Sequence, residues 1–266
     1  MAPASISAKE ELIDLVGTPH LSHSRINRYL TCPEQYRLYY VEKLRPKVQG
    51  SGLVFGAVIH GVLAGLFRTG TDPVSAFHSQ WRELIGVDVR YKERETWETL
   101  NEKGQKLVEK FLSQEMSKLR AVRGVEERFD LMVGSLPLPF IGIVDLVAEI
   151  NGDTTVIDFK TSASGYEDHE VELSDQLTAY SLAEPMATKV AYCVFVKTKE
   201  PRIDWHFAQR TPQERIEYVD KVRIVSADIL DGKFYKRPGK HCSYCDFLPL
   251  CMGNRKKAEE TLVQIT

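Results

Sequence analysis

The stretch FIGIVDLVAEINGDTTVIDFK, residues 140–160, decides the fold of this chain. Two runs rich in Val, Ile and Phe flank the dipeptide Asn151-Gly152, which strongly favours a two-residue hairpin turn. Asp145 stands in the first run and Asp158 in the second, and Lys160 follows Asp158 by two positions. Residues two apart on a strand face the same side of a sheet, and the opposed strands of a hairpin bring their side chains together. The stretch therefore predicts a hairpin that gathers two acids and a lysine at one end.

Further helix and strand patterns surround this hairpin. Expected helix starts carry capping residues, namely Ser22 or Ser24, Ser174, and Thr211 with Glu214 completing a capping box. The expected helices cover residues 21–44 with an interruption at Pro33, 53–68, most of 73–120, 172–185 and 211–232, and the other expected strands cover 125–133, 189–199 and 202–209. This order of elements predicts an α/β protein with a central mixed β-sheet flanked by helices.

Composition narrows the class of protein without naming a partner. The 266 residues are 43% apolar and 27% charged, which is ordinary for a soluble globular chain. The formal net charge of −2 carries no global signature of nucleic-acid binding. No run of about 18 unbroken apolar residues indicates a membrane span, and the first residues lack the pattern of a secretory signal. We therefore expect a cytoplasmic or nucleoid-associated protein that does not engage a membrane.

The two acids and the lysine suggest a metal site. Two unpaired carboxylates held close together repel each other unless a cation bridges them, and oxygen ligands suit Mg²⁺ or Mn²⁺. A lysine beside a metal-bound water can orient the water or accept its proton. A structural ion pair between Asp158 and Lys160 at the end of a strand is the alternative reading of the same three-residue pattern.

Four motifs in order resemble one nuclease family. The chain resembles the RecB-like branch of the PD-(D/E)xK nuclease superfamily, whose fold is a restriction-endonuclease-like core. The matching motifs are Gly56-x-x-x-His60, Gly142-Ile143-Val144-Asp145, Asp158-Phe159-Lys160 and Gln176-x-x-x-Tyr180. Each motif is weak alone, but four in the right order over about 120 residues are specific.

The resemblance implies a role for each motif residue. Metal ligands would be Asp145, Asp158, the Phe159 carbonyl and His60, and the metal would be Mg²⁺ or Mn²⁺. Lys160 would position or activate the attacking water. The pair Gln176 and Tyr180, which share a helix face, would hold the DNA strand or the lysine. Glu126 on a neighbouring strand is a further candidate acid, for which the structural reading is the preferred one.

Five cysteines indicate a second metal centre. Cys242, Cys245 and Cys251 form C-x2-C-x5-C near the C-terminus, and Cys32 stands alone near the N-terminus. Four thiolates suit either an iron–sulfur cluster or zinc. The resemblance extends to a subset of RecB-like nucleases, among them AddB-type and CRISPR-adaptation nucleases, in which a 4Fe–4S cluster joins the two chain ends. Cys193 lies in an apolar strand pattern and is expected in the core.

The expected domain organisation follows from these motifs. Residues 1–20 would be a flexible lead-in, 21–235 the nuclease domain with a helical insertion at about 70–120, and 236–266 a Cys-rich segment with a basic tail, closed by Cys32. Basic residues flank the cysteines and could either guide a DNA strand or form a solvated basic tail, namely Lys236, Arg237, Lys240, Arg255, Lys256 and Lys257.

The expected function is metal-dependent hydrolysis of DNA, with a preference for single strands or free ends, in repair, recombination or phage DNA processing. The alternatives are a CRISPR-adaptation nuclease that trims DNA before integration, and a DNA-binding module with an idle site. No P-loop motif is present, so a helicase or a CRISPR integration protein would be a separate partner.

Overall fold

A computed structural model describes residues 19–133 and 136–265. The lead-in expected over residues 1–20 lies almost entirely outside the described residues. The α-helices are α2 (His23–Thr31), α3 (Pro33–Tyr36), α4 (Ser51–Thr69), α5 (Pro73–Arg82), α6 (Trp97–Lys110), α7 (Asp168–Glu172), α8 (Asp175–Ala183), α9 (Pro212–Leu230), α10 (Leu248–Cys251) and α11 (Arg255–Thr261). The strands are β1 (Leu44–Pro46), β2 (Gln49–Gly50), β3 (Val89–Arg90), β4 (Leu119–Leu131), β5 (Phe140–Ile150), β6 (Asp153–Ser162), β7 (Lys189–Val196), β8 (Arg202–Ala208) and β9 (Leu262–Gln264).

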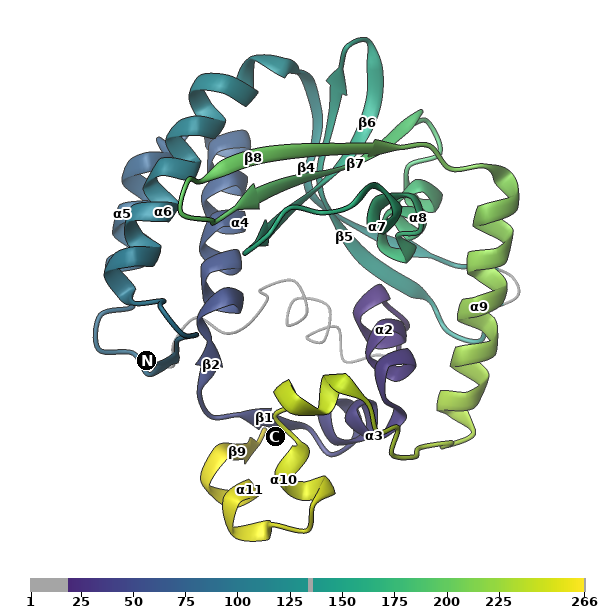
Figure 1. The fold of residues 1–266 in the computed structure, drawn as a ribbon. Helices are drawn as coiled ribbons and strands as arrows, with labels where there is room; N and C mark the ends of the chain where they lie inside the picture. Colours follow the sequence, from purple (N-terminus) through teal and green to yellow (C-terminus); the bar gives the residue numbers. More distant parts are fainter. Residues whose placement is uncertain (1–18, 134–135, 266) are drawn as a thin grey trace.

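The central sheet has five strands in the order β4-β5-β6-β7-β8. All neighbours run antiparallel except β6 and β7, which are parallel and are joined through α7 and α8. A parallel pair needs a crossover of this kind, whereas antiparallel neighbours need only short turns. The predicted mixed sheet flanked by helices is therefore confirmed (Figure 1).

The predicted hairpin is formed by β5 and β6. Its register runs from Ile150 opposite Asp153 to Leu146 opposite Ile157. Asn151 and Gly152 have φ angles of 53° and 86°. Two successive positive φ values are what a type I′ turn requires, and the twist of that turn matches the strands on either side. Local sequence chemistry thus sets the register of the hairpin.

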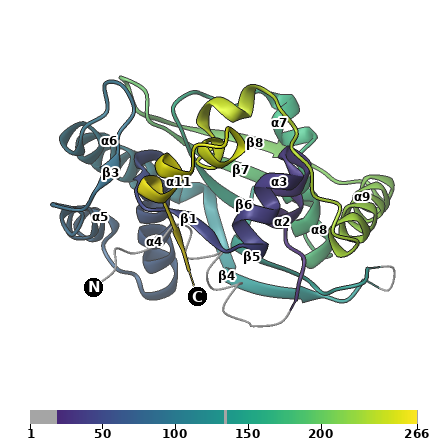
Figure 2. The ribbon, with the colours of Figure 1, turned by 90° about the horizontal axis from the view of Figure 1, so that it is seen from below.

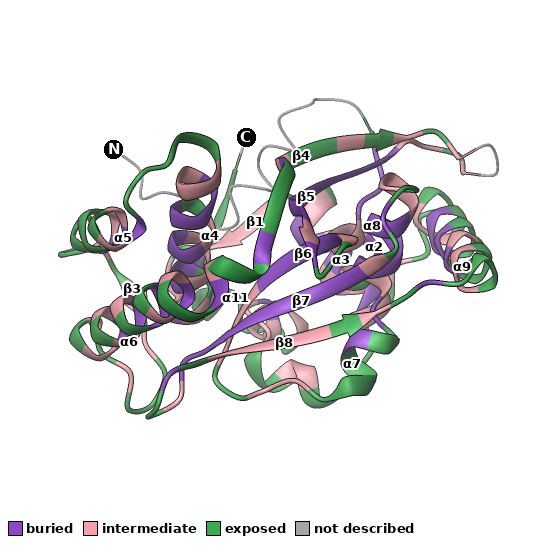
Figure 3. Cartoon of the chain, turned by 90° about the horizontal axis from the view of Figure 1, so that it is seen from above, coloured by how far each residue is buried: buried purple, intermediate pink, exposed green. Residues whose placement is uncertain are grey.

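Helices cover both faces of the sheet. On one face α4, α5 and α6 bury an aromatic-rich core against the sheet, and on the other α8 packs beneath α9 and α2 (Figures 1 and 2). Strand β5 is buried along almost its whole length because strands flank it on both sides and helices cover both faces (Figure 3). Among the described helices, α4 alone is long and apolar enough to cross a bilayer, a test that core helices also pass. Here its buried residues contribute to the core.

The predicted helix starts are confirmed. Ser22 caps α2, Ser174 caps α8, and Thr211 with Glu214 forms the capping box of α9. Each side chain accepts a hydrogen bond from an amide of the first turn that has no partner inside its helix.

The largest difference in a strand boundary is at the start of β4, and β7 also ends at Val196 rather than at 199. Strand β4 begins at Leu119 rather than near 125, with an irregularity between Arg120 and Gly124. Pairing of Leu119 with Ile150 extends the strand, and such long-range pairing leaves no local pattern.

The C-terminal segment returns to the start of the described chain. Strand β9 pairs antiparallel with β1, with Leu262 opposite Pro46 and Gln264 opposite Leu44. The Glu34 amide also donates to the Tyr235 carbonyl at 3.0 Å. Residues after α9 therefore lie against α3 and β1, as Figures 1 and 2 show.

Candidate active site

The candidate site lies where β5 and β6 part. The last pair of the hairpin is Leu146 with Ile157, and one further step in this register sets Asp145 opposite Asp158. Instead of a backbone pair, Asp145 Oδ2 accepts a hydrogen bond of 2.8 Å from the Phe159 amide. Both carboxylates are buried, with relative exposures of 3% and 1%. The hairpin register thus brings the two predicted acids to one spot at the open end of the ladder.

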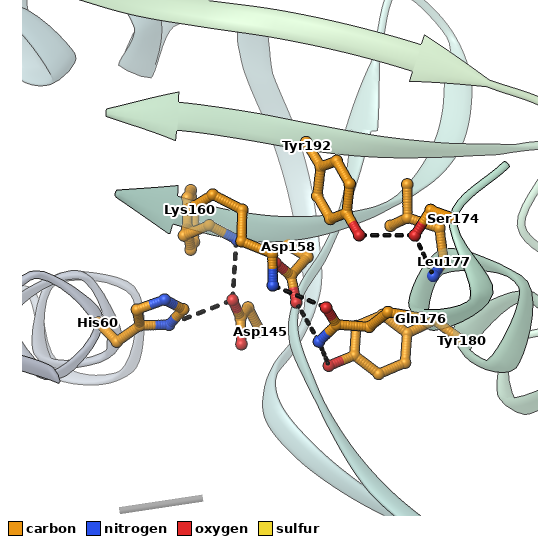
Figure 4. A network of polar contacts seen from close by, with 10 residues as sticks. His60, Asp145, Asp158, Lys160, Ser174, Gln176, Leu177, Tyr180 and Tyr192 are labelled. Atoms are coloured by element: carbon orange, nitrogen blue, oxygen red, sulfur yellow. Dashed lines mark hydrogen bonds and ion pairs between the residues drawn. The ribbon is translucent and has the colours of Figure 1, made fainter. Parts of the chain in front are cut away.

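Helix α4 supplies His60 to this spot. His60 Nδ1 lies 3.2 Å from Asp145 Oδ2 (Figure 4). Gly56 stands one turn earlier on the same helix, and a Cβ there would lie 3.2 Å from Thr161 Oγ1. The glycine lets α4 approach the end of β6 closely. The spacing of Gly56 and His60 therefore has a packing reason as well as a chemical one.

The side-chain amide of Gln176 connects Lys160, Asp158 and Tyr180. Lys160 Nζ lies 2.8 Å from Asp158 Oδ2 and donates to Gln176 Oε1 at 2.7 Å. Gln176 Nε2 donates to Asp158 Oδ1 at 2.9 Å and to the Tyr180 hydroxyl at 2.8 Å. These contacts place Lys160, Asp158, Gln176 and Tyr180 in one network (Figure 4). The D-x-K and Q-x-x-x-Y motifs, far apart as patterns, meet here.

Tyr192 of β7 is a site residue that the sequence reading missed. It lies opposite Asp158 in the parallel register, and Lys160 Nζ is 5.2 Å from the centre of its ring. Its hydroxyl is 2.6 Å from Ser174 Oγ, at the start of α8. Burial, offset in part by Lys160, raises the pKa of Tyr192 to about 12, so the ring stays neutral. No local pattern marks Tyr192, because its place depends on which strand lies beside β6.

The charge of Lys160 follows from its neighbours. Burial by itself lowers the pKa of Lys160, but Asp158 and Tyr192 act in the opposite direction and the net pKa is raised. The amine therefore carries its positive charge at neutral pH beside a buried carboxylate. A fixed ammonium can donate hydrogen bonds to a water or to a phosphate oxygen.

These groups open into a cavity of about 680 Å³. Its lining includes His60, Asp158, Phe159, Lys160, Gln176 and Tyr180, together with three polar residues from elsewhere in the chain, His23, Lys92 and Glu126. The structure thus places most of the predicted site residues along one hollow between α2, α4, α8 and the sheet.

His23, in the first turn of α2, is a second residue that the sequence reading missed. Burial, and next the charge of Lys160, lower the pKa of His23 to about 4, so its imidazole is neutral at physiological pH. Among the described residues its Nδ1 is buried without a hydrogen-bond partner. Because the ring is neutral, it adds no charge to the cavity wall that it lines.

Glu126, the further candidate acid, also lines the cavity. It lies on β4 between residues that pair with Leu146 and Val144, and therefore beside Asp145 across the two strands. Its φ angle of 47° is unusual for a residue with a side chain. The carboxylate is 3.1 Å from Arg68 Nη1. The ion pair with Arg68 gives Glu126 a structural role. Glu126 also lines the cavity, so it remains a candidate site residue.

The donors suit a hard divalent cation. They are the carboxylates of Asp145 and Asp158, the His60 ring and the carbonyl of Phe159, which lies on the same strand edge as the amide that Asp145 binds. Within residues 19–133 and 136–265, no three His, Cys, Asp or Glu side chains stand close enough together to hold a metal ion. Asp145 and Asp158 each make hydrogen bonds or ion pairs with protein groups. A bound cation would replace part of these contacts.

The cysteines gather at the junction of the chain ends. Cys32 is buried between α2 and α3, and Gln35 Nε2 contacts Cys245 Sγ at 3.5 Å. Burial raises the pKa values of the Cys245 and Cys251 thiols. All five cysteines are free thiols. Cys193 is fully buried in β7, as expected.

Comparison with known proteins identifies the family. A family model described as the PD-(D/E)XK nuclease superfamily matches residues 20–252. The chain belongs to this superfamily, and its five-stranded mixed sheet with flanking helices is consistent with the core of that fold. No curated protein sequence matches the chain.

One solved structure shares the fold. A candidate exonuclease from Eubacterium rectale superposes with a TM-score of 0.58 at 12% identity, covering 91% of this chain and 92% of that one. The structure of SSO0001 matches with a TM-score of 0.37 at 16% identity, covering 87% and 93%. The first likeness supports the fold, and the family match supports a nuclease that acts on DNA.

Proposed function

We propose that this protein is a metal-dependent DNA nuclease that hydrolyses phosphodiester bonds and prefers single strands or free ends. One observation carries the proposal: two buried acids on neighbouring strands lie together, and the second of them, Asp158, lines a cavity beside the charged Lys160. The candidate exonuclease from Eubacterium rectale is a structural neighbour over most of both chains, which favours the exonuclease form of the activity.

The site residues have two proposed roles: four groups bind a cation, and Lys160 orients the attacking water. Asp145, Asp158, His60 and the Phe159 carbonyl would hold Mg²⁺ or Mn²⁺. The cation would lower the pKa of a water molecule and neutralise charge on the phosphate. Lys160, fixed by Gln176, donates hydrogen bonds that orient a water molecule or a phosphate oxygen.

Gln176 and Tyr180 lie at the edge of this arrangement. The Tyr180 hydroxyl accepts from Gln176, and both side chains line the cavity. We propose that Gln176 holds the lysine directly and that Tyr180 fixes the amide in the required orientation. The Gln176 oxygen accepts a hydrogen bond and its nitrogen donates two, so a 180° rotation of the amide would break all of them.

We further propose that Cys32, Cys242, Cys245 and Cys251 hold a 4Fe–4S cluster that joins the chain ends. The supporting observations are the contact between Gln35 Nε2, three residues after Cys32, and Cys245 Sγ, and the return of the C-terminal segment to α3. Four thiolates fit such a cluster by donor chemistry, and zinc is the competing occupant. A tie across so long a loop would favour the folded chain by restricting the unfolded one.

End-labelled DNA tests the nuclease. We expect Mg²⁺- or Mn²⁺-dependent cleavage of single-stranded or end-bearing DNA by the wild-type protein purified without air. The Lys160→Ala variant should lose about 10²-fold or more in kcat, the scale of one fixed electrostatic group. Binding without cleavage by a folded wild type would instead indicate an idle DNA-binding module, and equal cleavage by both proteins would refute the site.

A further inference from the structure

A second cavity lies beside the candidate active site. It has a volume of about 610 Å³ and lies between three segments: the approach to α4, the loop that follows β3, and the Cys-rich segment. Gly50 and Lys92 line both cavities. The two hollows therefore adjoin at these residues.

The lining of the second cavity combines positive charge with an exposed aromatic ring. Its basic residues are Lys47, Arg90 and Lys92, and its acidic residues are Asp246 and Glu260. Arg90 pairs with Asp246 at 2.8 Å, and Lys257 lies 3.8 Å from Glu260. Asp246 is thus paired with Arg90, and Glu260 has one exposed cation close by.

The remaining cations are available to a ligand. The Lys47 ammonium donates to the Glu259 carbonyl at 2.6 Å, a neutral partner that leaves its charge uncompensated. Lys92 is exposed and makes no ion pair with any residue that the structure describes. Tyr244 stands at the same cavity with 77% of its surface exposed. Cationic groups that bind phosphates, together with a free aromatic face that stacks on bases, are the elements of single-strand recognition.

The loop that carries Lys92 is anchored by a buried ion pair between Glu95 and Lys197. Glu95, three residues further on, accepts from Ser51 Oγ at 2.6 Å and from Lys197 Nζ at 2.9 Å. The side chains of this ion pair are largely buried, with 12% and 4% exposure. A buried, hydrogen-bonded pair restricts the loop, so less conformational entropy is lost when a ligand binds.

We propose that the second cavity is a subsite for the single DNA strand that flanks the scissile phosphate. Lys92 binds a backbone phosphate at the junction, and Tyr244 stacks on a base beyond it. Stacking on Tyr244 needs a base that is free of a duplex, so the subsite selects single strands. The inference rests on the proposed nuclease function and assigns part of its substrate preference to residues outside the acids and the lysine.

Binding without cleavage tests the subsite first. Fluorescence anisotropy with labelled oligothymidylates in EDTA gives Kd over a salt series. Tyr244→Ala should raise Kd by about 5- to 100-fold, the range of one stacked base. Lys92→Ala should weaken binding and reduce the salt slope by about 0.7, and Lys92→Arg should restore both. The matched controls are Tyr235→Ala and Lys106→Ala, two exposed residues outside both cavities, which should bind as the wild type does.

Substrate length provides the second arm. In wild type, binding should tighten as the oligonucleotide grows long enough to reach Tyr244, and Tyr244→Ala should lose this gain while binding the shortest oligonucleotides normally. Unchanged binding and unchanged length dependence in both variants would overturn the subsite. If the variants bind DNA normally and the wild type cleaves it, the proposal of a nuclease stands and only the subsite is refuted. A wild type that binds strands through Tyr244 and Lys92 but cleaves none refutes the nuclease and keeps the binding subsite.

Discussion

Gln176 holds three groups of the candidate site with one side-chain amide. Its oxygen accepts from Lys160, and its nitrogen donates to Asp158 and Tyr180. Hydrogen bonds to charged groups contribute about 1.5–3 kcal/mol each, more than neutral ones. A residue with such contacts sets the geometry of its neighbours, so its removal should be felt in the turnover rate rather than in substrate binding.

We therefore expect Gln176→Ala to lower kcat by about 10- to 100-fold with a smaller change in KM. Tyr180→Phe removes only the outer hydrogen bond and should cost less. Initial rates on end-labelled single strands measure both effects. If Gln176 only contacts DNA, KM rises and kcat stays at the wild-type value.

His23 makes stability depend on pH. Its folded pKa of about 4 lies below the value of 6.5 expected in the unfolded chain, because burial and Lys160 disfavour the charged ring. The unfolded chain therefore takes up this proton first as the pH falls. The contribution is fully present above pH 6.5 and is lost progressively down to pH 4, by at most about 3 kcal/mol.

Urea unfolding in metal-free buffer tests this expectation. The free energy of unfolding of the wild type should fall as the pH is lowered across that window. The variant His23→Gln, which cannot titrate there, should show a shallower fall. Parallel pH profiles for the two proteins would mean that His23 is readily protonated in the folded state.

At the scale of elements, close approach of helices shapes the roof over the sheet. Gly104 of α6 faces Phe77 of α5, and a Cβ at Gly104 would lie 1.9 Å from Phe77 Cζ. The Phe77 ring is fully buried and stacks on Trp81 with centroids 5.8 Å apart. The ring has no free space into which it can retreat, since protein interiors are close-packed.

We expect Gly104→Ala to destabilise the protein by about 1–3 kcal/mol through overpacking, despite the better helix propensity of alanine. Gly61→Ala in α4 is the matched control, because its Cβ would meet only the flexible end of Gln80 at 3.4 Å. That variant should be neutral or gain up to about 1 kcal/mol. Chemical denaturation of both variants measures the difference, and equal stability would show that α5 and α6 pack more loosely.

At the scale of the whole molecule, the chain ends meet. Strand β9 pairs with β1, and the cysteine segment lies against α3, so residues that are about two hundred positions apart share one region. A metal bound there would act as a staple between the ends. Its loss would increase the freedom of the unfolded chain more than that of the folded one.

Metal content tests the staple. Protein purified without air should contain iron and sulfide, and Cys32→Ser should lose both and unfold at a lower temperature. Cys193→Ala is the control, because Cys193 is buried in β7 and takes no part in the cysteine group. Its metal content should match the wild type. Zinc in place of iron would overturn the cluster and keep the staple, whereas an unaltered metal content in Cys32→Ser would overturn both.

Local chemistry made part of this molecule predictable. The turn Asn151-Gly152 and the alternation on either side of it were sufficient to predict the hairpin, and capping residues marked the helix starts. The sequence did not predict Tyr192 or Lys92 as site residues, because each lies at the site only through packing between separate elements. A strand partner or a loop position is set by the packing of the whole chain, which leaves no fixed spacing to read.

The sequence by itself determined the hairpin, the mixed order of helices and strands, and the spacing that sets Asp158 beside Lys160. These follow from turn geometry and side-chain periodicity, which act over a few residues. Only the tertiary structure decided that His60 reaches Asp145, that His23 stays neutral, and that a second cavity adjoins the first. Such features depend on burial and on distances between remote segments, and those exist only once the chain has packed.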